Sequence, residues 1–166
     1  MTKQKISVIK EQLDWITSQY AHQINSPKFD LNPIVLLRTI AHIESSYGKN
    51  NIPRFEKRWY VGGRYFKNIK DGLDLVKKYG ANIACSFSSF QILYWTARDL
   101  GYEGRPLFLC GDDIAIPYIV KFCNWKLKKA KNIGEFADMY NSGSIDESIP
   151  ILYINNFKEK YEELIK

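Results

Sequence analysis

The sequence has few of the residues from which metal, disulfide and catalytic-triad sites are built. Of its 166 residues, three are cysteine and two are histidine. No Cys-x-x-Cys pair occurs, and no histidine stands at metal-ligand spacing from a cysteine. We therefore expect buried free thiols in a reducing compartment, and no metal, cofactor, Ser-His-Asp triad or zinc site.

Long apolar runs are also missing. No stretch approaches the roughly 20 apolar residues that a membrane-spanning helix needs. The residues from Met1 to Glu11 lack the apolar core of a secretion signal. We expect a monomer that is made in the cytoplasm without an export signal of its own and does not insert stably into a membrane.

The chain has an ordinary apolar fraction of 45%, many aromatic residues (14%) and a net charge of +6. The apolar fraction indicates a globular domain, and the net charge leaves two anionic partners open, namely nucleic acid and a bacterial envelope rich in anionic polymers. The densest cationic runs, Arg54 to Arg58 and Lys126 to Lys131, are equally typical of a solvated surface. No nucleic-acid recognition motif accompanies them, so we do not expect nucleic acid to be the partner.

Apolar residues recur at helical spacing along most of the chain and predict a mainly α fold. We expect one compact domain, with an N-terminal helix and loop over residues 1–30 and the core over residues 31–166. A small β-hairpin is expected at about residues 52–67, where aromatic and β-branched residues flank Gly62 and Gly63. The predicted helices cover about residues 6–24, 33–47, 71–79, 91–100, 112–127, 133–140 and 150–164.

The helix that begins at Pro33 organises the chain. Asn32 is a favourable N-cap, and proline suits the first helical position because that position has no intrahelical use for an N–H. Gly48 can supply the left-handed residue that ends the helix. The apolar residues of this helix repeat at spacings of three and four and predict one buried face, made of Leu36, Leu37, Ile40 and Ile43.

Glu44 lies on or beside this buried face, one turn from the end of the helix. A carboxyl group in an apolar setting is either paired or stays protonated to a higher pH, and in the second case it can act as a general acid. The alternative is a glutamate at the edge of the stripe with its head group in water. His42, two residues away, points to a different face of the helix.

Three segments become informative through their order, namely Ile43–Ser46, Ser86–Leu93 and Ala137–Gly143. Over about residues 31–164 the chain resembles the goose-type lysozyme and soluble lytic transglycosylase superfamily. That family carries Glu-Ser at a helix end, then a Gly-Leu-Met-Gln-Ile-like turn, then Ala-Tyr-Asn-Ala-Gly. This chain departs from the family with Ser88-Ser89-Phe90 in place of Gly-Leu-Met and with Met139 in place of an alanine.

The resemblance implies a lysozyme-like α+β fold and cleavage of the β-1,4 bond between N-acetylmuramic acid and N-acetylglucosamine in peptidoglycan. It implies that Glu44 is the proton donor, since the leaving oxygen must be protonated as an oxocarbenium-like centre develops. Gln91 would hydrogen-bond the glycan strand, and Tyr140 would orient Glu44 or an acetamido group. Further candidates for the substrate groove are Asn141, Ser46 and Ser89. Most of these residues have an alternative, purely structural role. Gln91 could be an ordinary helix N-terminal residue, and Tyr140 a core aromatic. Asn141 could be only a C-cap, and Ser46 only a local backbone cap.

The resemblance does not decide whether a second carboxylate takes part in the reaction. An inverting hydrolase needs a base that activates water, whereas in a lytic transglycosylase a hydroxyl of the sugar attacks and a 1,6-anhydro end forms. Glu56, in the predicted hairpin, is the candidate base. Its alternative role is a salt bridge with Arg54, Lys57 or Arg58.

Other functions also stay open. One is a chitin-cleaving relative, and another is a catalytically inactive module that binds cell-wall glycan, which the altered turn at Ser88–Phe90 motivates. The range of the family suggests a phage-type enzyme that acts on the cell wall in host lysis or as part of a virion, exported by other means.

Overall fold

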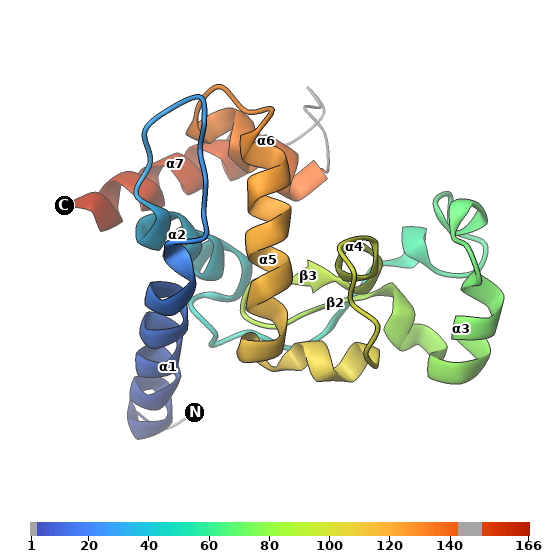
Figure 1. The fold of residues 1–166 in the computed structure, drawn as a ribbon. Coiled ribbons are helices and arrows are strands. Elements are labelled where there is room, and N and C mark those ends of the chain that lie inside the picture. Colours follow the sequence, from blue (N-terminus) through green and yellow to red (C-terminus); the bar gives the residue numbers. More distant parts are fainter. Residues whose placement is uncertain (1–2, 143–150) are drawn as a thin grey trace.

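The computed structural model describes residues 3–142 and 151–166 (Figure 1). The mainly helical class predicted from the sequence is confirmed. Residues 143 and 150, at the ends of the third motif and of the last predicted helix, lie outside this description. The described α-helices are α1 (Lys3–Ala21), α2 (Pro33–Ser45), α3 (Gly72–Tyr79), α4 (Tyr94–Asp99), α5 (Asp112–Leu127), α6 (Ile133–Ser142) and α7 (Ile151–Ile165).

Helix α2 packs against both α1 and α7 (Figure 1). Its first turn is capped as the sequence predicts, because the Asn32 side chain accepts hydrogen bonds from the Ile34 and Val35 N–H groups at 3.1 and 3.2 Å. The helix ends earlier than predicted. Ser46 already adopts a left-handed conformation, with φ 52°, and Gly48 repeats it at φ 79°. The predicted apolar face is fully buried at Leu36, Leu37 and Ile40.

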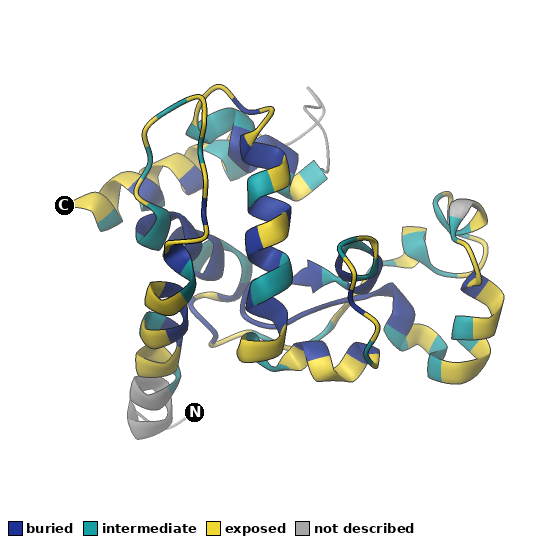
Figure 2. Cartoon of the chain, viewed as in Figure 1, coloured by how far each residue is buried: buried dark blue, intermediate teal, exposed yellow. Residues whose placement is uncertain are grey.

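The hydrophobic core joins the inner faces of α1, α2, α5, α6 and α7 to the segment of residues 83–97 (Figure 2). Helix α5 runs through the middle of this arrangement and is buried over much of its length. Two of the three thiols are buried as predicted, Cys85 and Cys123, whereas Cys110 is exposed. No described helix combines the length and the apolar character needed to cross a bilayer.

A three-stranded antiparallel sheet in the order β1-β2-β3 lies beside this core. Strand β1 (Arg54–Phe55) pairs with β2 (Cys85–Phe87), with Arg54 opposite Ser86. Strand β2 pairs with β3 (Ile92–Leu93), with Phe87 opposite Ile92. Strands β2 and β3 therefore form a tight hairpin, where the sequence predicted a loop and the start of a helix.

The predicted location of the hairpin, residues 52–67, needs correction. Within it the structure has a single strand, β1, followed by two 3₁₀ turns (Lys57–Trp59 and Phe66–Asn68). Gly63 closes a local turn, since its N–H donates to the Tyr60 carbonyl at 2.7 Å. A Cβ atom there would stand 2.5 Å from the carbonyl oxygens of Lys57 and Arg58, so the glycine permits a compact turn rather than a strand reversal.

The segment from residue 51 to residue 82, which includes α3, forms a smaller part of the molecule with little core of its own (Figure 2). Of its described residues, Gly72 alone is buried. This part stands opposite α6 and α7 in Figure 1, with β2, β3 and α4 between. Its position makes it one wall of the cleft described next.

Candidate active site

A cleft of about 1260 Å³ runs between the helical part and the residues that follow β1. One wall comes from the ends of α2, α5 and α6 and from the start of α7. The other comes from β1, the turns after it, β3 and α4. Six aromatic side chains line the cleft, namely Trp59, Tyr65, Phe122, Trp125, Tyr140 and Tyr153. Such flat apolar faces suit the stacking of sugar rings.

Glu44 is the penultimate residue of α2 and contributes its carboxyl group to this cleft. Its side chain is only 10% exposed. Oε1 accepts a hydrogen bond from the Tyr153 hydroxyl at 2.7 Å, and Oε2 lies 3.4 Å from Nη2 of Arg54. Of the two alternatives that the sequence left open, the geometry gives a part-buried, partnered carboxyl group rather than a fully solvated one.

The electrostatic setting of Glu44 combines opposing effects. Burial raises the pKa of this carboxyl group, and the negative charge of Glu56 adds a smaller effect in the same direction. The Tyr153 hydrogen bond and the Arg54 guanidinium lower it, but burial outweighs both. Burial also raises the pKa of Tyr153, so this hydroxyl keeps its proton and remains a donor. The net result favours the protonated form of Glu44.

Glu56 lies in the same cleft and is ion-paired, as the alternative role predicted. Its Oε1 is 3.4 Å from Nε of Arg54, and its Oε2 is 3.8 Å from Nη2 of Arg58. Its side chain is 26% exposed. One guanidinium group, that of Arg54, therefore contacts both Glu44 and Glu56, through Nη2 and Nε.

Gln91 closes the β2–β3 hairpin in a left-handed conformation, with φ 50°. Its Oε1 accepts from the Ser86 hydroxyl at 2.9 Å, and its Nε2 donates to the Ser88 carbonyl at 2.9 Å and to the Ile52 carbonyl at 3.4 Å. The side chain lines the cleft but its amide is engaged by the protein. The geometry therefore supports Gln91 chiefly as a brace of the β2–β3 hairpin that lines the cleft.

Tyr140 does not orient Glu44. Its hydroxyl donates to the Phe90 carbonyl at 2.9 Å and so ties α6 to the β2–β3 hairpin. Tyr153 of α7 makes the contact with Glu44 that was one of the two roles expected of Tyr140, and the other role, contact with an acetamido group of the substrate, stays a prediction. Both tyrosines line the cleft. The sequence carries a signal for Tyr153, because it repeats with Phe157 on a buried helix face, where a phenol hydroxyl needs a partner.

The remaining candidates divide between the cleft and the interior. Asn141 is exposed and lines the cleft. Ser46 is an exposed cap residue of α2 and is not part of the described cleft lining. Ser89 is fully buried, with its N–H and hydroxyl donating to the Asp112 carboxylate at 2.7 and 2.8 Å. Ser46 and Ser89 are thus structural residues in this geometry.

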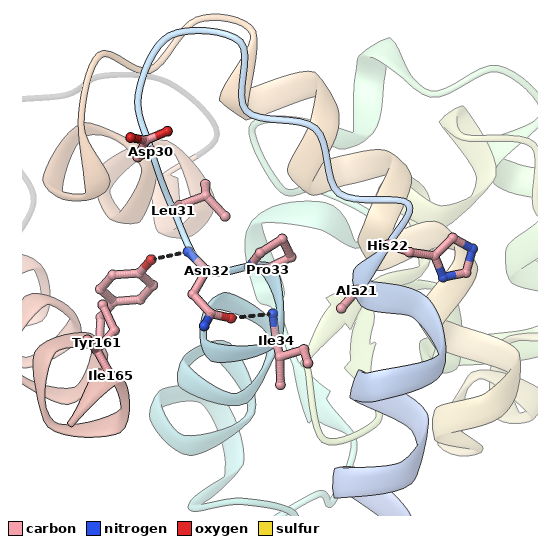
Figure 3. Close-up of a pocket in the computed structure, with 9 residues that line it drawn as sticks. All are labelled: Ala21, His22, Asp30, Leu31, Asn32, Pro33, Ile34, Tyr161 and Ile165. Carbon is pink, nitrogen blue, oxygen red and sulfur yellow. Dashed lines mark hydrogen bonds between the residues drawn. The ribbon is translucent and has the colours of Figure 1, made fainter.

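A second pocket, of about 670 Å³, lies at the opposite end of α2 (Figure 3). Its polar groups serve the fold, since the Tyr161 hydroxyl accepts a 2.7 Å hydrogen bond from the N–H of Asn32. His22 and Asp30 point away from each other and form no acid–base pair. Helix α2 starts at this pocket and runs roughly 17 Å to Glu44. The two pockets therefore do not share a site.

Within residues 3–142 and 151–166, no group of three or more His, Cys, Asp and Glu side chains could hold a metal ion. No protein-family model, curated protein or solved structure matches the chain. Function is therefore inferred from the cleft geometry together with the three ordered motifs.

Proposed function

We propose that this protein cleaves the β-1,4 bond between N-acetylmuramic acid and N-acetylglucosamine in peptidoglycan, with Glu44 as the proton donor. The main support for this proposal is the setting of the Glu44 carboxyl group. This group is 10% exposed, its pKa is raised by burial, and it stands in the wall of an aromatic-lined cleft. A general acid needs a carboxyl group that holds its proton near the working pH, and an apolar setting provides it.

In the first step Glu44 delivers a proton from Oε2 to the glycosidic oxygen while the bond between that oxygen and the anomeric carbon breaks. The leaving sugar departs with a new hydroxyl group, and positive charge develops on the other sugar. Tyr153, donating to Oε1, holds the carboxyl group in one orientation and stabilises the carboxylate that remains.

Two completions are compatible with the cleft. In a hydrolase, water attacks the anomeric carbon, Glu56 accepts the proton of that water, and the product has a reducing end. In a transglycosylase, the C6 hydroxyl of the sugar attacks, Glu44 accepts its proton, and the product has a 1,6-anhydro end. The contact of both carboxyl groups with Arg54 supports Glu56 as the candidate base, because a shared guanidinium partner keeps Glu56 near Glu44 in the same cleft.

The wider cleft supports a glycan ligand. Its aromatic side chains offer stacking surfaces for successive sugar rings. The net charge of +6 suits an anionic cell wall as the place of action, whether in host-cell lysis or as part of a virion.

Digestion of purified peptidoglycan, followed by mass spectrometry of the soluble fragments, tests this proposal. Soluble muropeptides support it, and their reducing or anhydro ends separate the two completions. Chitin oligomers of matched length serve as the second substrate, and equal turnover of both would point to a chitin-cleaving enzyme. Binding to cell walls without release of fragments would instead favour an inactive glycan-binding module.

A further inference from the structure

Arg54 contacts both Glu44 and Glu56, but the two carboxyl groups differ in how many cationic partners they have. Its Nη2 lies 3.4 Å from Glu44 and its Nε lies 3.4 Å from Glu56. Glu56 has a second cationic neighbour, Arg58, at 3.8 Å. Within the described residues, Arg54 makes the one ion pair of Glu44. Movement of Arg54 would therefore leave Glu44 without a cation and Glu56 with one.

The contacts of Arg54 are loose enough to be exchanged. Both nitrogen–oxygen distances exceed the about 2.7–2.9 Å of strong charge-assisted hydrogen bonds. The side chain is 56% exposed, and its backbone belongs to β1, at the edge of the described sheet. Arg54 is thus the exposed member of a pair whose other member, Glu44, is only 10% exposed. When the guanidinium group changes partners, the buried carboxyl group can take up a proton instead of remaining an unpaired charge.

The contact with Glu44 opposes the first chemical step. A guanidinium group beside a carboxyl group favours its ionised form, whereas a general acid must be protonated. If a substrate group binds Arg54 and removes it from Glu44, burial then favours the protonated form of Glu44 without opposition from the guanidinium charge. Such a group must be anionic, and a carboxylate fits best because it pairs with guanidinium through two parallel hydrogen bonds.

We propose that Arg54 is a specificity-determining residue that binds a carboxylate of the glycan substrate and thereby releases Glu44. A neutral glycan of the same backbone lacks this group and leaves Arg54 on Glu44. The inference rests on the proposed function and narrows its substrate class to glycan strands that carry a carboxylate near the scissile bond.

Calorimetry on the Glu44→Gln protein, which we expect to bind the glycan without turnover, tests the inference. Three oligomers of equal length are compared, namely peptide-free strands with free lactyl carboxylates, strands with acidic peptide stems, and neutral chitin. We expect one or both acidic oligomers to bind about tenfold more tightly than chitin, as for a hydrogen bond between charged groups. The acidic oligomer that binds tightly identifies the lactyl group or the stem as the source of the carboxylate.

Arg54→Met in the same background should abolish this preference. Arg58→Met is the matched control, because it removes the same charge from the same cleft without touching Glu44, and most of the preference should remain. Preference that survives Arg54→Met, or falls equally with Arg58→Met, overturns the inference and leaves the proposed function standing. Failure of the parent protein to bind any of the three oligomers contradicts both.

Discussion

The hydroxyl of Tyr153 donates a 2.7 Å hydrogen bond to Oε1 of Glu44, joining two residues that are 109 positions apart in the chain. This contact depends on the packing of α7 against α2 (Figure 1). It occupies one carboxyl oxygen of Glu44 and leaves the other, Oε2, to face Arg54 and the cleft. In the proposed mechanism, the proton given to the substrate is therefore assigned to Oε2.

Replacement of Tyr153 by phenylalanine should extend activity to higher pH. The hydrogen bond stabilises the ionised form of Glu44, so its loss raises the pKa of this carboxyl group further above its ordinary value. Since the acid must be protonated, the falling limb of kcat/KM against pH moves to higher pH. The release of soluble fragments from labelled peptidoglycan, measured across pH, gives this profile.

Tyr161→Phe is the matched control for that variant. It makes the same change on the same helix, at the second pocket rather than in the cleft. Loss of the hydrogen bond with Asn32 should lower the free energy of unfolding by about 1 kcal/mol and leave the pH profile in place. Equal limb shifts in both variants, or no shift in Tyr153→Phe, would contradict the assigned role of Tyr153.

Glu44→Gln should stabilise the fold at neutral pH while removing the acid. Burial raises the pKa of Glu44 in the folded state, so ionisation of this group destabilises the fold. The penalty is absent below the unfolded pKa of about 4.3 and develops as pH rises through the higher folded pKa. Thermal melts should therefore show a higher Tm for the variant at pH 7 and a smaller difference at pH 4. A lower Tm at pH 7 would mean that Arg54 and Tyr153 outweigh burial.

Asp112→Ala should destabilise the β2–β3 hairpin that lines the cleft. The carboxylate accepts hydrogen bonds from both the N–H and the hydroxyl of Ser89, whose side chain is buried. Without it the N–H loses its partner, and the free energy of unfolding should fall by about 1–3 kcal/mol in urea titration. Asp113→Ala, at the exposed neighbouring position, should change it by less than about 0.5 kcal/mol. Equal effects would show that the loss reflects the start of α5 rather than the Ser89 contacts.

Glu56→Gln should act on one product and spare the other. In the proposed mechanism, Glu56 serves as base only when water attacks, so the variant should lose reducing ends and retain any 1,6-anhydro ends. Mass spectrometry of the digest counts both kinds of end in one sample. A parallel loss of both would mean that Glu56 supports the cleft through Arg54 and Arg58 rather than through water.

Local features of this fold are predictable from the sequence. The Asn32 cap and the buried face of α2 at Leu36, Leu37 and Ile40 follow from short-range rules, because capping and helical spacing act within one or two turns. The place of Glu44 beside that face follows in the same way. The mainly helical class, which the structure confirms, was predictable because helical spacing of apolar residues is also a short-range pattern.

Contacts between distant segments could not be predicted. Pairing of Arg54 with Ser86 joins strands about thirty residues apart, and no local pattern distinguishes it from a hairpin across Gly62 and Gly63. That Tyr153 rather than Tyr140 contacts Glu44 was also not predictable, because it depends on the packing of distant helices. Both tyrosines have pKa values raised by burial, and only the packing of α7 on α2 decides which hydroxyl reaches the carboxyl group.

The most direct test of Glu44 as the proton donor compares the unchanged protein with Glu44→Gln on purified peptidoglycan. Circular dichroism and a thermal melt establish first that the variant is folded, and mass spectrometry then measures the rate at which soluble muropeptides appear. We expect that rate to fall by about 10²–10⁴-fold, the usual contribution of a positioned acid. A folded Glu44→Gln protein that releases muropeptides at the original rate would contradict the proposed mechanism.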